Sequence, residues 1–196
     1  EEISVHVYQL YLSRMKGALA EAGNAVTTDA YWNTYISTDH TTTAAITGRR
    51  EFRASGKVEV TAEDGDTDAH AQVSGLSAAL GLTVGVSVAD ADADSRVCAY
   101  IGSKDGSAAV SGLILEAGEL AVNAIQTTVT ATADSSSSSG ALYANAGVDI
   151  ADADTNTTVL AKVNAQSVTG CADGMAISAL LKAAEATTRL TRRGVS

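Results

Sequence analysis

Small apolar residues alternate with polar residues along most of this chain, and the alternation changes phase several times. The apolar residues of 58–62 occupy even positions, those of 69–73 odd positions, those of 82–88 even positions and those of 89–101 odd positions. Successive residues of a strand face opposite sides of a sheet, so each change of phase predicts a corner after which the other parity faces inward. The pattern therefore predicts repeated short strands joined by corners.

The same pattern returns 62 residues further along the chain. Residues of one stretch have counterparts of similar type 62 positions later: Val58, Val60, Val88, Asp92 and Val97 return as Leu120, Val122, Ile150, Asp154 and Val159. A unit that recurs with its corners is typical of coils stacked around one narrow core. We therefore predict an all-β fold, a parallel β-solenoid in which each unit forms about three coils. A β-sandwich would also have short alternating strands, but it would not require the repeat.

The repeat divides the chain into four regions. Residues 1–57 are a degenerate N-terminal copy, 58–119 a repeat unit, 120–170 a second repeat unit, and 171–196 a C-terminal partial repeat or a helical cap. Within the first region, residues 32–36 match residues 97–101 at an offset of 65, which predicts an insertion of three residues between positions 37 and 57.

Each end of the chain is compatible with either a helix or a strand. The first 22 residues have apolar side chains at helical spacing, but the first few also alternate as a strand would. Residues 171–196 combine helix-forming Ala, Lys and Glu with the register of a further strand. A terminal helix would have a physical purpose, because it would cover the open β-edge at the end of the coils.

The composition supports a narrow core and excludes some partners. Aromatic residues make up 4% of the chain and proline is absent, so the core must be built from small and β-branched side chains. The formal net charge of −10 argues against nucleic acid as a partner and against an anionic membrane surface. There is no apolar run long enough to predict membrane insertion.

The two cysteines, Cys98 and Cys171, do not occupy equivalent positions of the repeat. A disulfide framework would need more cysteines at matched spacings, so we interpret both as unpaired thiols. Cys98 shares the parity of the neighbouring aspartates, which predicts that it faces outward.

Aspartates form ladders in which every second residue is acidic, and these are the candidate site. The parity of the neighbouring alanines predicts that the carboxylates point outward, and stacked coils would bring them close together laterally. Calcium binds such oxygen ligands flexibly, so a calcium site could use Asp90, Asp92, Asp94, Asp152 and Asp154. The alternative is a solvated acidic face that keeps the protein soluble and discourages lateral aggregation. Because the aspartates recur with the repeat, they indicate a scaffold rather than a catalytic pair, and we expect no enzyme activity.

Three segments also resemble a known family. Val86–Asp90, Val97–Gly102 and Leu120–Ala124 are similar to the repeats of very large bacterial filamentous adhesins, the haemagglutinin-like and leukotoxin-like surface proteins. The resemblance extends over about residues 27–170. It implies a parallel β-solenoid at the bacterial cell surface or outside the cell.

These observations together predict a non-enzymatic, extracellular structural or adhesive protein. It would be a stalk segment or a filament subunit that associates with further copies end to end, with a host or cell-surface ligand as a second partner. The alternative function is a calcium- or glycan-binding module on the outward aspartate face.

Overall fold

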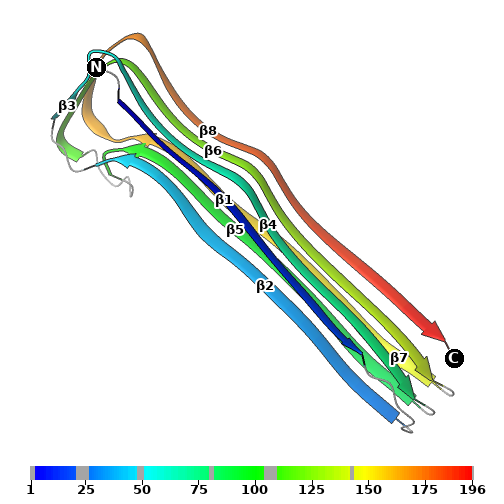
Figure 1. The fold of residues 1–196 in the computed structure, drawn as a ribbon. Helices are drawn as coiled ribbons and strands as arrows, with labels where there is room; N and C mark the ends of the chain where they lie inside the picture. The colour runs from blue at the N-terminus through cyan, green and yellow to red at the C-terminus, as the bar shows by residue number, and fades with distance from the viewer. Residues whose placement is uncertain are drawn as a thin grey trace.

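A computed structural model describes residues 3–20, 27–47, 51–79, 82–103, 110–141 and 144–195. The described residues form strands and no helix, so the all-β prediction is confirmed (Figure 1). The strands are β1 (Ile3–Ala20), β2 (Thr27–Ile46), β3 (Glu51–Arg53), β4 (Lys57–Ala79), β5 (Leu82–Ile101), β6 (Val110–Ala141), β7 (Ala144–Val163) and β8 (Ala165–Val195).

The strands belong to two parallel sheets, and the chain alternates between them. Sheet A contains β1, β4, β6 and β8 in that order, with the short β3 also paired to β6. Sheet B contains β2, β5 and β7. The strands of sheet A run in one direction along the molecule and those of sheet B return in the other (Figure 1).

The strand register explains the 62-residue repeat. Val58 of β4 pairs with Leu120 of β6, and Asp90 of β5 pairs with Asp152 of β7. Each unit therefore makes one pass along sheet A and back along sheet B. The prediction of about three coils per unit is wrong, because the chain forms two long strands where we expected several short ones.

The first region is shorter than the repeat, not longer. β1 begins by pairing with β4, and β2 with β5, at an offset of 55 residues. The difference arises mainly in the turn that follows β2 in the first pass and β5 in the second. The chain advances five residues from Ile46 to Glu51, whereas it advances thirteen residues between their partners, Ile101 and Ile114. The predicted insertion of three residues before position 57 is therefore wrong, since the extra residues follow β5.

A change of parity occurs inside β4 rather than at a corner. The inward side chains are Val58, Val60 and Ala62 before the change and Ala69 and Ala71 after it. At the change itself the pairing of β4 with β6 skips one residue pair, and the strands bend together part-way along their length (Figure 1). A parity change thus marks a bend in a continuous strand.

The core between the sheets consists of two apolar clusters. The wide cluster contains larger side chains and includes Phe52, Val58, Val60, Val97, Ile101, Leu113, Leu115, Leu120 and Val122. The alanine cluster is built mainly of the smallest side chain: Ala69, Ala71, Val73, Ala89, Ala91, Ala93, Val129, Ala131 and Ala133. The inward direction of the alanines in β5 confirms the parity argument for that strand.

Both ends of the described chain are strands. β1 pairs with β4, and β8 pairs with β6 along most of its length, so the helical alternatives are wrong for residues 3–20 and 165–195. Each terminal segment meets an open sheet edge whose backbone groups need partners over many residues. This long-range pairing outweighs the helix propensity of Ala, Lys and Glu in β8.

Candidate functional site

The predicted aspartates do lie together, on the outer face of sheet B. β5 and β7 are neighbours, and their register places Asp90 beside Asp152 and Asp92 beside Asp154. On the other side of β5, Asp94 has Asp39 of β2 as its partner. Sequence analysis missed Asp39, although the offset of 55 that relates β2 to β5 would have aligned it with Asp94.

The central strand of this acidic face is the least exposed. Asp90, Asp92 and Asp94 are half-buried, whereas Asp152 and Asp154 on β7 are exposed. Burial raises the pKa of Asp90, and the neighbouring carboxylate of Asp152 raises it further. Burial also raises the pKa of Asp92, with additional repulsion from the carboxylates of Asp94, Asp154, Asp90 and Asp39, in that order. The face therefore holds negative charge at an energetic cost.

The geometry of the acidic face limits how it could bind a metal. Paired residues on neighbouring strands are about 4.8 Å apart, and residues two apart on one strand are about 6.5–7 Å apart. Calcium prefers six to eight oxygen ligands at about 2.3–2.6 Å, so an ion on this face would bridge two strands and keep several waters. Among the described residues, no three His, Cys, Asp or Glu side chains are grouped as a metal site.

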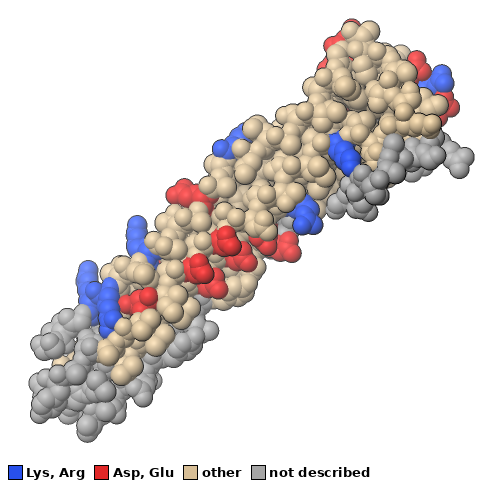
Figure 2. Space-filling model, turned by 180° about the vertical axis from the view of Figure 1, so that it is seen from behind, with Lys and Arg blue, Asp and Glu red and all other residues tan. Residues whose placement is uncertain are grey.

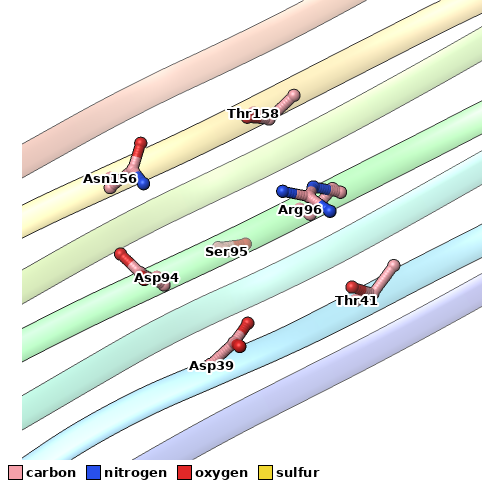
Figure 3. Close-up of a pocket in the computed structure, with 7 residues that line it drawn as sticks. All are labelled: Asp39, Thr41, Asp94, Ser95, Arg96, Asn156 and Thr158. Carbon is pink, nitrogen blue, oxygen red and sulfur yellow. The ribbon is translucent and has the colours of Figure 1, made fainter.

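A polar depression of about 200 Å³ lies at one end of the acidic face (Figure 3). Its lining comes from β2, β5 and β7 and consists of Asp39, Thr41, Asp94, Ser95, Arg96, Asn156 and Thr158. Asp39, Asp94 and Asn156 form one row across the three strands, and Thr41, Arg96 and Thr158 form the next. Hydroxyl, amide, carboxylate and guanidinium groups are thus presented together, which is a surface suited to hydroxyl-rich ligands.

A second polar group lies inside the molecule, between the wide cluster and the alanine cluster. We call it the polar belt, and it consists of Asp64, Thr67, Ser95 and Gln126, all buried. The Ser95 hydroxyl is 3.0 Å from Asp64 Oδ2 and 2.5 Å from Gln126 Oε1. Gln126 Nε2 donates to the carbonyl oxygens of Gly65 (3.0 Å) and Thr128 (3.2 Å).

The polar belt was missed because Asp64 resembles the surface aspartates that follow it. Its parity was the available signal, since Asp64 occupies an even position like Val60 and Ala62, which are buried. The belt lies where the inward parity changes, and its bonds to the carbonyls of Gly65 and Thr128 satisfy backbone groups at the bend. It therefore supports the bend, and its side chains are buried, although Ser95 also lines the polar depression.

The cysteines are both free thiols. Cys98 is only 1% exposed, so the prediction that it faces outward and lies outside the core is wrong. It does have the parity of the aspartates, but Thr43 and Leu160 are its partners on the two neighbouring strands. Cys171 is half-buried, has a positive φ of 46° and packs against the wide cluster.

Charged side chains are unevenly distributed over the elongated molecule. Figure 2 shows a group of acidic side chains about midway along one face, with basic side chains both beside this group and towards the ends. Near the start of β4, Lys57 lies 3.3 Å from Glu59 and 3.7 Å from Glu119. Farther along sheet A, His70 Nε2 is 3.1 Å from Asp134 Oδ2.

Comparison with known proteins gives no relative: no family model, curated protein or solved structure matches this chain. In the part of the chain that the structure describes, there is no helix of the length and hydropathy needed to span a membrane.

Proposed function

We propose that this chain is a structural β-solenoid module that acts without catalysis and associates through its open strand edges. The observation that carries the proposal is the strand order: every pass adds one parallel strand to sheet A and one to sheet B, in constant register for β4–β6 and β5–β7. A winding of this kind has no internal limit, because each new pass creates the same edge for the next.

The outermost strands support this function. Among the described strands β8 pairs with β6 alone, and its exposed apolar side chains include Met175, Ile177, Leu181 and Leu190. Exposed, long and apolar edge strands favour pairing with another chain. The resemblance to filamentous surface proteins supports the same role and an extracellular or bacterial cell-surface location, where a host or surface ligand would be a further partner.

The shape of the molecule changes how such a filament would look. The strands run along the long dimension of the protein (Figure 1), and new strands are added across it. A filament that grows by stacking would therefore have its strands perpendicular to its axis, with a repeat of about 4.8 Å along that axis. It would be a ribbon as wide as the strands are long rather than a thin stalk.

Cryo-electron microscopy of the purified chain at rising concentration, with and without a calcium chelator, tests this proposal. We expect particles that associate along the stacking direction, show the ~4.8 Å repeat and do not respond to the chelator. Isolated particles at every concentration would contradict the proposal.

The acidic face favours one alternative, a module that binds calcium or a glycan. Repulsion between the carboxylates around Asp90 and Asp92 supports a bound cation on this face, and the adjacent depression offers groups suited to a glycan. Calcium titration followed by calorimetry distinguishes the two functions. Stoichiometric binding with an increase in thermal stability would favour the alternative.

A further inference from the structure

The polar depression on the outer face of sheet B holds its charged groups in two rows. Asp39 and Asp94 are partners on β2 and β5, and Asn156 of β7 completes the first row. Arg96 of β5 lies in the second row, between a threonine of β2 and a threonine of β7 (Figure 3). Negative charge therefore lines one side of the depression, and positive charge lines the other.

The charges of the two rows do not pair with each other. Among the described residues, no ion pair joins Arg96 to Asp39 or to Asp94. Elsewhere on the surface such pairs do form, as between Lys57 Nζ and Glu59 Oε2 at 3.3 Å. Arg96 and Asp39 are exposed and Asp94 is half-buried, so these charged groups are accessible to a small molecule in the depression.

The spacing of the two rows fits the two charged groups of an α-amino acid. Residues two apart on a strand are about 6.5–7 Å apart, and their side chains stand roughly perpendicular to the sheet. Charge-assisted hydrogen bonds are about 2.8 Å long, and standard bond lengths place the amine nitrogen of an amino acid about 2.5 Å from its carboxyl carbon. Two such bonds with the amino acid between them reach about 8 Å, so a ligand just above the side chains can bridge the rows.

We propose that the polar depression binds a free α-amino acid with a short polar side chain. The ammonium group of the ligand lies between Asp39 and Asp94, which are neighbours about 4.8 Å apart across two strands. It donates to both carboxylates and offsets the repulsion between them. The carboxylate of the ligand accepts hydrogen bonds from the guanidinium of Arg96, whose planar fork matches it. The site lies within one copy of the chain, so this inference does not depend on the proposed association.

The rest of the lining decides which side chain fits. With the ammonium group between β2 and β5, the side chain of the ligand points towards β7, where Asn156 and Thr158 are both exposed. An amide and a hydroxyl can each donate or accept a hydrogen bond. Every lining residue is polar, so an apolar side chain would find little apolar surface to cover. A short side chain with a hydroxyl or an amide is therefore preferred.

The same three contacts select one enantiomer. In Figure 3 the buried Ser95 lies behind its strand, so sheet B is seen from outside, and a ligand held by three groups directs its α-hydrogen towards the viewer. From this side, the order of carboxylate at Arg96, side chain towards β7 and ammonium group towards β2 runs anticlockwise, which is the D configuration. We therefore expect D-amino acids to bind more tightly than L-amino acids, and D-serine is a suitable small probe.

Saturation-transfer NMR of D-serine with the full chain tests this proposal, because it detects weak ligands whether or not the chain associates. We expect a dissociation constant of about 1 mM or more, since exposed ionic contacts are weak. D-Alanine lacks the hydroxyl, N-acetyl-D-serine lacks the ammonium group and L-serine has the opposite handedness, so each should bind at least about threefold more weakly. An analogue that binds as tightly as D-serine, or the absence of saturation transfer to D-serine, would overturn the inference.

Two pairs of variants locate the site within the outer face of sheet B. Asp94→Asn and Arg96→Gln should each weaken the binding of D-serine at least about threefold. Asp152→Asn and Lys162→Gln make the same changes of charge on the same face but outside the depression, and should change binding by less than about 1.5-fold. Arg96→Gln should not weaken the binding of D-serinamide, which has no carboxylate for Arg96 to bind. Equal effects of the variants inside and outside the depression would contradict the proposed site.

The outcomes also separate this inference from the functions proposed above. Glucose that binds as tightly as D-serine would overturn the inference and favour a glycan as the ligand. A chain that forms filaments but gives no saturation transfer to D-serine would overturn the inference and leave the proposed structural function intact. Binding of D-serine to a chain that stays monomeric at every concentration would support the inference and contradict that function.

Discussion

β6 and β8 occupy the same sheet and pair residue by residue, yet their side chains have very different surroundings. Leu120 of β6 is fully buried, while its partner Met175 on β8 is 59% exposed. The same contrast holds for Val122 and Ile177, at 0% and 46%. The two strands have similar apolar patterns, so the difference arises from their neighbours. β6 has strands on both sides and two strands opposite, whereas β8 lies at the edge.

Truncating the paired residues Leu120 and Met175 gives the largest expected effect. Leu120→Ala should lower the free energy of unfolding by about 2–5 kcal/mol, because it removes a fully buried side chain and leaves a cavity. Met175→Ala should lower it by less than about 1 kcal/mol, because that side chain is mostly in solvent already. Urea denaturation of both variants, at concentrations where the chain is monomeric, measures the difference. Equal losses would show that β8 is as well covered as β6.

The next largest effect on stability is expected from one of two buried serines on β5. The Ser95 hydroxyl forms hydrogen bonds within the polar belt, to Asp64 and Gln126. The buried Ser87 hydroxyl has no hydrogen-bond partner among the described residues. Ser95→Ala should destabilise the protein by about 1–3 kcal/mol, because it removes the buried hydroxyl that bonds to Asp64 Oδ2 and Gln126 Oε1. Ser87→Ala should be neutral or slightly stabilising, since it removes a buried polar atom that makes no bond. Thermal unfolding of the two variants checks the pair, and a similar loss from both would contradict the assigned role of the belt.

Local pattern predicted the core-facing residues far better than it predicted the length of the strands. The alternation around Asp90 and Asp92 identified the outer face of β5 correctly, because a strand fixes the direction of each side chain. The change of parity near Asp64 was ambiguous, since a corner and a bend give the same pattern. The bend depends on Ser95 and Gln126, which are 31 and 62 residues from Asp64. Contacts at that distance in sequence leave no local signal.

The two terminal strands also depend on long-range contacts that the local sequence does not reveal. β8 contains residues with good helix propensity, and its strand structure depends on the edge that β6 offers it. The acidic face was found because its residues alternate within one strand, whereas Asp39 required the offset between β2 and β5. The strand register could be predicted for the two central passes, because both contain the full 62-residue unit. The predicted register was wrong for the first pass, which is shorter than this unit.

The acidic face should make the protein more stable as the pH falls, whereas a salt-bridged aspartate makes a protein less stable as the pH falls. The pKa of Asp92 is raised above its ordinary value of 3.8, so the folded state binds protons more readily than the unfolded state. Stability from this group is therefore lowest at neutral pH and rises as the pH falls through the raised pKa towards about 4. Asp92→Asn removes the group and should flatten this part of the profile. Denaturation of both proteins between pH 7 and pH 4 gives the difference, and parallel profiles would contradict the repulsion described here.

The smallest effect is expected at the edge, from Arg192. Its guanidinium donates to the carbonyl of Gly147, which lies on the edge strand of sheet B. Both groups are near solvent, so Arg192→Ala should lower the free energy of unfolding by less than about 1 kcal/mol. Lys at this position would keep the charge but not the planar fork, and should recover only part of the loss. Hydrogen exchange provides the finer measurement, because an edge held by Arg192 should exchange more slowly around Gly147 than the same edge in Arg192→Ala. A loss comparable with that of Leu120→Ala would mean that the edge is packed as tightly as the centre of the sheets, and the contrast between β6 and β8 would not hold.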